Sequence, residues 1–204
     1  MDTSDLYRDI TDFAHDTPHW VQSAFEVWTE YGLLLFGLLY IAVWWRARGR
    51  RDPQAVARAV LAPLVTALVY VASEVVKSTI DEERPCRAVA RAAAPLVPCP
   101  PYGDWSFPSN HSAIAGAAAV ALALAVPRLA ALTLPMAALM AFSRVFVGVH
   151  YPHDVGMGLL LGASLGALAV ALLTGPMTRV IAAVQGSGIR AAVWFTGPGP
   201  ARHP

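Results

Sequence analysis

The hydrophobic residues of this chain are gathered into five long runs separated by short polar stretches. Each run is near the ~20 residues that an α-helix needs to cross a bilayer. The runs are rich in Ala and Leu, and none alternates polar with apolar residues, so the pattern favours helices over strands. We therefore predict an all-α, polytopic membrane bundle of about five transmembrane helices. The runs lie roughly at residues 27–45, 59–76, 109–126, 129–149 and 155–174.

The two ends of the chain have a different character. The first part mixes apolar side chains with many acids, which is typical of an amphipathic helical segment at the membrane surface. The last part is punctuated by Gly and Pro, and we expect it to be partly disordered, with a short interfacial helix around residues 177–184. The pattern predicts an N-terminal interfacial helical segment over residues 1–30, a transmembrane domain over 31–175 and a C-terminal tail over 176–204.

The composition also favours a membrane protein. The chain has 204 residues, of which 56% are hydrophobic and 14% are charged, and its mean hydropathy is +0.48. That is too apolar for an ordinary soluble domain. The alternative, a soluble bundle, would have to cover five apolar helices with very little polar sequence. A net charge of +1 and the lack of a basic stripe argue against a nucleic-acid partner.

Arginines are concentrated on one side of a five-span arrangement. The first loop, the third loop and the tail hold nine of the 15 Lys and Arg residues but a single acid, Asp52. The positive-inside rule makes this side cytoplasmic. We therefore expect a multi-pass plasma-membrane protein whose C-terminus is cytoplasmic and whose long loop over residues 81–107 faces outward. The nine residues are Arg46, Arg48, Arg50, Arg51, Arg58, Arg128, Arg179, Arg190 and Arg202.

Ionisable side chains interrupt the apolar sequence on the opposite, outer side. The stretch "SRVFVGVHYPHD", residues 143–154, holds an arginine, two histidines and an aspartate between two apolar runs. Because chain entry and exit alternate, this stretch should meet the end of the second run and the start of the third on one membrane face. The residues expected there are Lys77, Arg84, Ser109, Asn110, His111, Arg144, His150 and Asp154.

These residue types suit the binding of a phosphate group. Lys77, Arg84 and Arg144 supply positive charge and hydrogen-bond donors, and each arginine can bind an oxyanion through two parallel bonds. Ser109 is a suitable N-cap for the third apolar helix, whose first backbone N–H groups would point at an anion. The pattern therefore predicts a phosphate site on the outer face.

Two histidines and a carboxylate complete the expected chemistry. His150 with Asp154 four residues later indicates a nucleophile and the carboxylate that orients it. His111 can then protonate the leaving oxygen as a general acid. The simpler alternative is that both histidines are interfacial side chains. We interpret His153 as a surface residue, and we predict no metal ligand.

Three ordered motifs resemble the signatures of the type 2 phosphatidic acid phosphatase superfamily, which includes membrane lipid phosphatases and vanadium haloperoxidases. The resemblance implies a hydrolase that needs no metal ion or other cofactor and that passes through a phosphohistidine. A haloperoxidase would share the pocket but not the membrane spans. The motifs are K-x6-RP at residues 77–85, PSNH at 108–111 and SR-x5-H-x3-D at 143–154.

The resemblance implies a role for each matched residue. His150 would be the nucleophile, Asp154 its partner and His111 the acid. Asn110 stands where the common family pattern has glycine. Its backbone N–H would keep the anion cradle, while its side chain would narrow the site. The residues implied to hold the phosphate are Lys77, Arg84, Ser109, Asn110 and Arg144.

A membrane lipid is the expected substrate. We predict undecaprenyl diphosphate in the outer leaflet, because a diphosphate matches three cationic side chains better than a monoester does. Bacterial undecaprenyl-diphosphate phosphatases of this superfamily also often carry an aspartate at the position of Asn110. Phosphatidylglycerol phosphate and phosphatidate are the alternatives, since the motifs recognise phosphate and not the tail. A transporter or flippase would place ionisable groups in the middle of its spans. The oligomeric state stays open.

Both cysteines, Cys86 and Cys99, lie in the expected outer loop. Thiols oxidise readily outside the cytoplasm, so we predict a disulfide between them. Two free thiols are the alternative.

The last apolar run carries a repeated G-x-x-x-G stripe, made by Gly158, Gly162 and Gly166. Small residues at this spacing let helices approach closely in a membrane. We predict that the stripe packs within the bundle, with a dimer interface as the alternative.

Overall fold

The computed structural model describes residues 2–198, and this part of the chain is helical with no strands. The all-α prediction is confirmed. The helices, joined by loops, are α1 (Ser4–Asp16), α2 (His19–Arg48), α3 (Pro53–Lys77), α4 (Pro85–Ala88), α5 (Asn110–Ala125), the 3-10 turn η1 (Pro127–Leu129), α6 (Ala130–Phe146), α7 (Pro152–Gly186) and α8 (Arg190–Thr196).

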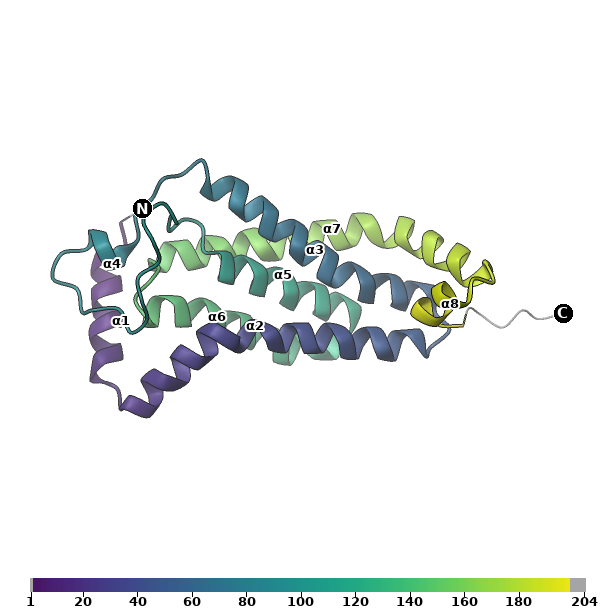
Figure 1. Ribbon diagram of the computed structural model, residues 1–204, viewed down its shortest axis with the longest axis horizontal. Coiled ribbons are helices and arrows are strands. Elements are labelled where there is room, and N and C mark those ends of the chain that lie inside the picture. Colours follow the sequence, from purple (N-terminus) through teal and green to yellow (C-terminus); the bar gives the residue numbers. More distant parts are fainter. Residues whose placement is uncertain (1, 199–204) are drawn as a thin grey trace.

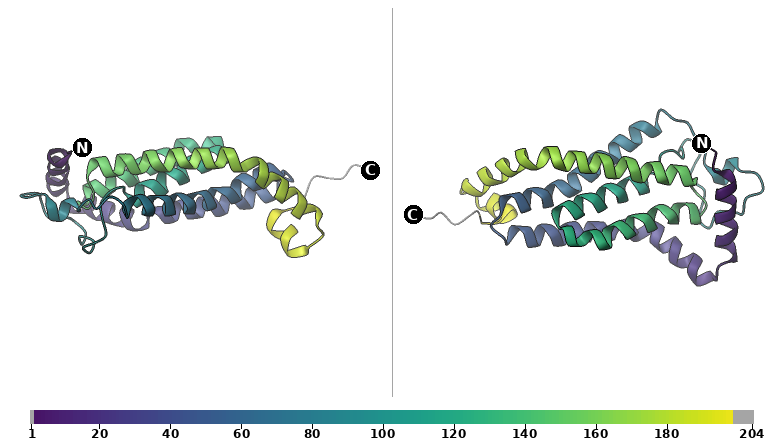
Figure 2. Two further views of the ribbon diagram at one scale, coloured as in Figure 1. Left: turned by 90° about the horizontal axis from the view of Figure 1, so that it is seen from above. Right: turned by 180° about the vertical axis from the view of Figure 1, so that it is seen from behind.

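Five of these helices run alongside one another as a bundle (Figures 1 and 2). The segments containing α2, α3, α6 and α7 are long and apolar enough to cross a membrane. The fifth, α5, has only 16 residues, or about 24 Å of helix. It lies among the others and packs mainly against α7, α3 and α6. The predicted multi-pass membrane protein is confirmed, with one of its five apolar helices shorter than the rest.

Small side chains allow the central position of α5. Its sequence is mostly Ala, and most of its residues are buried. The glycine stripe of α7 faces it: a Cβ atom added at Gly158 would lie 2.5 Å from the Ser109 carbonyl oxygen, and one added at Gly162 would collide with the Ala113 carbonyl. The stripe therefore packs within the bundle, as predicted. This contact brings the first turns of α5 and α7 together.

Helix α1 lies crosswise at one end of the bundle (Figure 1). Tyr7 is fully buried, and its hydroxyl donates to the carbonyl of Gly148 at 2.9 Å. Only Thr17 and Pro18 separate α1 from the next helix, α2. A proline disfavours helical backbone at the residue before it, here Thr17. The boundary expected at residue 30 therefore falls inside the continuous helix α2, which begins at His19.

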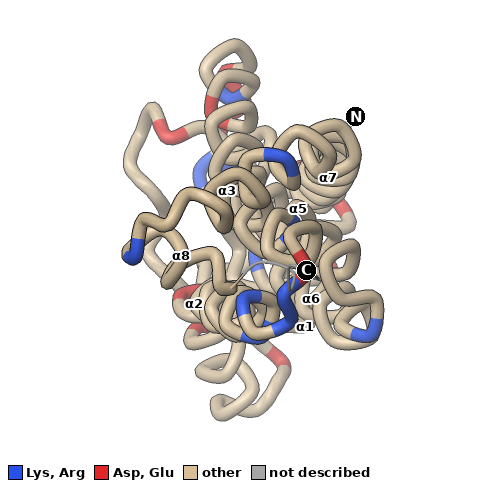
Figure 3. Tube along the Cα trace, turned by 90° about the vertical axis from the view of Figure 1, so that its right-hand side faces the viewer, with Lys and Arg blue, Asp and Glu red and all other residues tan. Residues whose placement is uncertain are grey.

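The opposite end of the bundle carries the C-terminal segment. Helix α7 continues through Pro176 to Gly186, so the tail boundary expected at residue 176 lies within a helix. The expected disorder is also absent from α8, which folds back onto α2: the Trp44 indole donates to the Phe195 carbonyl at 3.1 Å. Figure 3 is a view onto this end, and positions of Lys and Arg residues, drawn in blue, cluster there around the ends of the helices. Arg202 and the rest of 199–204 lie outside the described residues.

The long segment between α3 and α5 folds over the end where α1 lies. A disulfide links Cys86 to Cys99 within it, with a Cα–Cα distance of 6.1 Å. The backbone N–H of Leu96 donates to the Val147 carbonyl at 3.0 Å, and that of Ser106 donates to the Glu82 carbonyl at 2.8 Å. The segment is thus fastened to itself and to the connection between α6 and α7.

Replacing Gly162 by Ala should destabilise the protein, whereas the same change at Gly175 should not. Both glycines lie inside α7, but Gly175 has no neighbouring atom within 4 Å of an added Cβ. At Gly162 the added methyl must push the α5 backbone away, and such overpacking costs about 1–3 kcal/mol. Thermal unfolding of the detergent-purified variants measures the difference. A G162A variant as stable as G175A would contradict this account of the packing.

Candidate active site

The eight residues expected at one membrane face lie together at the end of the bundle that α1 covers (Figure 1). They come from the last turns of α3 and α6, the loops that follow these helices, and the first turns of α5 and α7. Most are buried although they are polar or charged: Lys77, Arg84, Ser109, Arg144, His150 and Asp154.

His150 and Asp154 form a buried pair. The Nδ1 atom of His150 lies 3.3 Å from Oδ2 of Asp154. This same oxygen accepts hydrogen bonds from the Tyr151 backbone N–H at 2.8 Å and from the Ser106 hydroxyl. Pro152 starts α7 and places Asp154 at its third position, where the carboxylate caps the helix. The carboxylate therefore cannot turn away from the imidazole.

Arg84 determines which nitrogen of His150 carries the proton. Its Nη1 atom lies 3.1 Å from Nε2 of His150 and 3.0 Å from the Val149 carbonyl oxygen. Arginine can only donate, so Nε2 must accept. The proton of a neutral imidazole then sits on Nδ1, toward Asp154. His150 is therefore in the tautomer with the proton on Nδ1 and the lone pair on Nε2, and this is the tautomer in which Nε2 can act as a nucleophile.

The surroundings of His150 keep it uncharged. Complete burial, together with the nearby charges of Arg144 and Arg84, holds the pKa of His150 well below its ordinary value. The ring is therefore neutral at physiological pH, and its Nε2 lone pair accepts from Arg84 instead of carrying a proton.

Three cations, Lys77, Arg84 and Arg144, lie close enough to His150 for their charges to act on it. Arg84 is anchored by its Nε, which donates to the Asp104 carbonyl at 2.8 Å. Arg144 donates from Nη1 to the Thr29 hydroxyl at 2.7 Å, but its buried Nε has no hydrogen-bond partner among the described residues. A buried guanidinium N–H without a partner is costly, and an oxyanion would satisfy it.

The carboxylate of Asp104 lies between two of the cations. Its Oδ1 is 2.9 Å from Nη2 of Arg84 and 3.4 Å from Nζ of Lys77. Burial alone would raise the pKa of Asp104, but the hydrogen bond and charge of Arg84, with the charge of Lys77, outweigh it and lower the pKa. The side chain is ionised and acts as an internal anion. A lone aspartate in a loop carries no motif, so sequence reasoning missed it.

The first turn of α5 is arranged differently from the sequence expectation. Ser109 occupies the N-cap position without a capping side-chain bond, and its backbone N–H donates to the Asp154 carbonyl at 3.2 Å. The Asn110 amide is bound to α3: its Oδ1 accepts from the Ser73 hydroxyl at 2.7 Å, and its Nδ2 donates to Glu74. The Asn110 side chain therefore ties α5 to α3 and is already occupied there.

The two remaining histidines differ in their surroundings. His111, the second residue of α5, is half-buried, and its ring makes no hydrogen bond to any described residue, which leaves both nitrogens for a ligand. The surface interpretation of His153 was wrong. Its ring lies between Glu82, Asp154 and Thr3, because the start of α7 turns it toward the outer loop and the N-terminus.

Together these groups can carry out attack on phosphorus. A neutral imidazole with an oriented lone pair faces a pocket of cations, and a second histidine lies nearby to exchange a proton. Sequence motifs identified eight of the residues. They did not identify Ser106, Asp104 or Thr29, which reach the site through loop folding and helix packing.

Comparison with known proteins places this arrangement in a family. The family model described as the PAP2 superfamily matches residues 58–176. An undecaprenyl-diphosphatase of Sulfolobus acidocaldarius is 42% identical over 79 residues, which are 38% of this chain and 38% of that protein. The undecaprenyl-diphosphatase BcrC of Bacillus subtilis is 29% identical over 147 residues, covering 72% of this chain and 67% of that protein. The chain thus spans little more than a third of the first relative.

A solved structure has the same arrangement of helices. It is the crystal structure of the first transmembrane PAP2 type phosphatidylglycerolphosphate phosphatase from Bacillus subtilis. The TM-score is 0.58 with 25% sequence identity, and the match covers 86% of each chain.

Removal of the internal anion should strengthen oxyanion binding. In Asp104→Asn the cations Lys77 and Arg84 lose their competing carboxylate, so orthovanadate should bind more tightly. At this half-exposed position the gain should be about 1 kcal/mol, or roughly fivefold in Kd. Isothermal titration calorimetry of the purified protein measures it. The matched control is Asp81→Asn in the same loop, which is exposed and should bind like the wild type. Weaker binding in D104N would show that Asp104 organises the site instead.

Proposed function

The chain belongs to the PAP2 superfamily, and on that premise we propose that it is an integral-membrane lipid phosphatase that works through a phosphohistidine at His150. The observation that carries the proposal is the His150 lone pair, fixed by Asp154 on one side and by Arg84 on the other. A neutral, oriented imidazole can attack a phosphorus atom that the cations hold in place once Arg84 turns its N–H from Nε2 to the phosphoryl oxygens.

In the first step, Nε2 of His150 attacks phosphorus and the bond between phosphorus and the leaving oxygen breaks. His111, which becomes protonated when the anionic phosphate offsets the neighbouring cations, gives that oxygen its proton. The Nδ1–H of His150 stays on the ring, where Asp154 stabilises the positive charge that the imidazole acquires. Lys77, Arg84 and Arg144 offset the charge that spreads over the equatorial phosphoryl oxygens. The product is a phosphohistidine and the dephosphorylated lipid.

In the second step, water attacks the phosphohistidine. His111, now deprotonated, takes a proton from the water. The bond between phosphorus and Nε2 breaks, inorganic phosphate forms, and His150 returns to its neutral state. The same histidine therefore acts first as acid and then as base.

We take undecaprenyl diphosphate as the first-choice substrate. The two relatives described above bear the name undecaprenyl-diphosphatase. A diphosphate also carries more negative charge than a monoester, so it is the better match for three cationic side chains. The resemblance of Asn110 to aspartate supports this choice less than expected, because its amide is bound by Ser73 and Glu74. The rival is phosphatidylglycerol phosphate, since a solved structure of similar fold is of a phosphatidylglycerolphosphate phosphatase.

We place the reaction at the outer leaflet of the plasma membrane. The candidate site and the cluster of arginines lie at opposite ends of the bundle (Figures 1 and 3). The positive-inside rule assigns the arginine end, including Arg46, Arg128 and Arg179, to the cytoplasm. The site then faces outward at the helix ends, where a phosphate headgroup can enter while its tail stays in lipid.

The two histidines should respond differently to mutation. His150→Ala should lower phosphate release by about 10⁴-fold or more, because the nucleophile is gone. His111→Ala should lower it by about 10²–10⁴-fold on phosphatidate, whose leaving group is an alkoxide, and far less on a prenyl diphosphate, whose leaving group is a phosphate. The control is His15→Ala on α1, which should match the wild type. Equal losses on both substrates in H111A would contradict the general-acid role.

The lipid panel tests the substrate. Phosphate release by the detergent-purified protein with EDTA present should be fastest on undecaprenyl diphosphate, slower on phosphatidylglycerol phosphate and slowest on phosphatidate. A strict requirement for Mg²⁺ would overturn the mechanism. Faster turnover of phosphatidylglycerol phosphate than of the diphosphate would overturn the choice of substrate and leave the mechanism intact.

A substrate of the same class tests on which side of the membrane the active site lies. A short-chain prenyl diphosphate added to intact cells that express the protein should be hydrolysed without permeabilisation, and cells with His150→Ala supply the background. Hydrolysis seen only after permeabilisation would place the site on the cytoplasmic side.

A further inference from the structure

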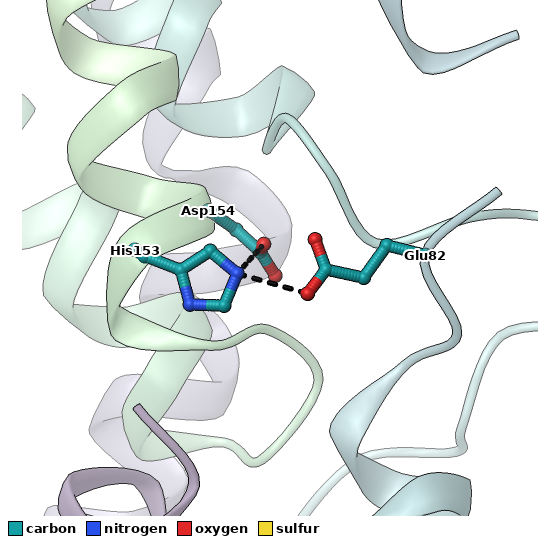
Figure 4. Close-up of side chains that lie close together, drawn as sticks. All are labelled: Glu82, His153 and Asp154. Atoms are coloured by element: carbon teal, nitrogen blue, oxygen red, sulfur yellow. Dashed lines mark hydrogen bonds and ion pairs between the residues drawn. The ribbon is translucent and has the colours of Figure 1, made fainter. Parts of the chain in front are cut away.

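A second group of side chains that could bind a metal ion lies next to the candidate active site and shares Asp154 with it. Glu82 comes from the loop after α3, and His153 and Asp154 come from the first turn of α7 (Figure 4). The Nε2 atom of His153 is 2.9 Å from Oε1 of Glu82 and 3.3 Å from Oδ1 of Asp154. One nitrogen and two carboxylate oxygens thus face a common point, with all three atoms within 4.8 Å of one another.

The two oxygens of Asp154 have different surroundings. Oδ2 accepts from the Tyr151 N–H and the Ser106 hydroxyl and lies against His150. Oδ1 is buried and has no hydrogen-bond partner among the described residues, although it points at the His153 ring (Figure 4). A buried carboxylate oxygen without a donor is unfavourable and calls for a cation or another ligand.

His153 is held in an orientation that suits a metal ligand. Its Nδ1 atom lies 2.7 Å from the Thr3 hydroxyl, so Nδ1–H can donate to that oxygen. Nε2 then presents its lone pair toward Glu82 and Asp154. Metal-binding histidines usually have their second nitrogen held in this way by an oxygen acceptor. The Tyr151 ring stacks on the imidazole, with 5.1 Å between centroids, and fixes its plane.

Two of the three spacings between the ligand atoms are close to those around a small divalent ion, and the third, between the Glu82 and Asp154 oxygens, is at most 4.8 Å. Ligands about 2.0–2.1 Å from a tetrahedral zinc ion lie about 3.4 Å from each other. The distance from His153 to Asp154 is 3.3 Å, which already matches, and the distance from His153 to Glu82 is 2.9 Å. Glu82 needs to retreat by only a few tenths of an ångström, and it lies in a loop with a partly exposed side chain.

We propose that Glu82, His153 and Asp154 bind a divalent transition-metal ion, with Zn²⁺ as the best match, and that the bound ion inhibits the phosphatase. Imidazole with carboxylates favours zinc over the all-oxygen ions Mg²⁺ and Ca²⁺. Water supplies the fourth ligand. The site is regulatory, and it is separate from the three cations that hold the phosphate.

Inhibition follows from the shared carboxylate, and this part rests on the proposed function. Asp154 stabilises the positive charge that His150 acquires as it attacks phosphorus. A dication on Oδ1 neutralises the carboxylate and repels that developing charge from the other side. The phosphohistidine should therefore form more slowly when zinc is bound, while the lipid still binds to Lys77, Arg84 and Arg144.

Direct titration tests the metal site without any assay of activity. The full-length protein, purified in detergent and stripped with EDTA that is then removed, is titrated with ZnCl₂ by calorimetry. Glu82→Gln should weaken zinc binding at least about tenfold. The matched control is Glu83→Gln, the next residue, which pairs with Arg87 and should bind zinc like the wild type. His153→Gln should weaken binding as Glu82→Gln does, provided that its unfolding temperature shows an intact fold.

Phosphate release then tests inhibition in the same samples. Zinc should slow the wild type and the Glu83→Gln variant, and the concentration for half-inhibition should rise at least about tenfold in Glu82→Gln, whose activity without zinc should stay near that of the wild type. Zinc affinity unchanged in Glu82→Gln would overturn the site, because His153 would then simply form ion pairs with the two carboxylates. Normal zinc binding without inhibition would overturn the regulatory role. Absence of phosphatase activity would count against the proposed function and leave the titration result standing.

Discussion

One buried carboxylate, that of Asp154, connects the separate parts of this site. It caps the first turn of α7 through the Tyr151 N–H, and it lies against the His150 imidazole and the Ser106 hydroxyl. The backbone carbonyl of the same residue accepts from Ser109 at the start of α5. A buried charge is tolerated only when its surroundings satisfy it. The groups that surround its Oδ2 atom are the same groups that orient the His150 imidazole, so the stability of the fold and the geometry of the site are coupled.

That arrangement needs α5 and α7 to approach far more closely than ordinary side chains allow. The contact of Gly158 with Ser109, and of Gly162 with Ala113, supplies the space. Without a hydrophobic driving force between helices in lipid, such close backbone packing is a main source of association. The short α5 thus depends on its neighbours for its position. Its first turn is held level with the last turns of α3 and α6 and the first turn of α7, so that the charged side chains gather at one end of the bundle.

Much of the fold and of the candidate site could be predicted from the sequence, because the strongest sequence signals are local. Apolar runs of membrane length predict helices, and motif spacing alone brings His150 to Asp154 across one helical turn. Residues whose position depends on long-range folding could not be found in this way. Thr29 binds Arg144 across 115 positions of sequence, and Asp104 reaches Arg84 through a loop. The boundaries expected at residues 30 and 176 fall inside helices for a related reason: a helix continues until its backbone is interrupted, whatever the polarity of its side chains.

The pocket must hold its cations together both with and without a phosphate. Three buried positive side chains close together would repel one another if nothing lay between them, and their burial makes that repulsion stronger than it would be in water. Asp104, placed between Lys77 and Arg84, offsets it while the pocket holds no substrate. The carboxylate is half-exposed and carried on a loop that includes Gly103 in a left-handed conformation. Under the proposed function, it is therefore the group that an arriving phosphate would displace. Its return would mean that the product does not leave behind a bare cluster of positive charge, and this favours release of phosphate over tight binding.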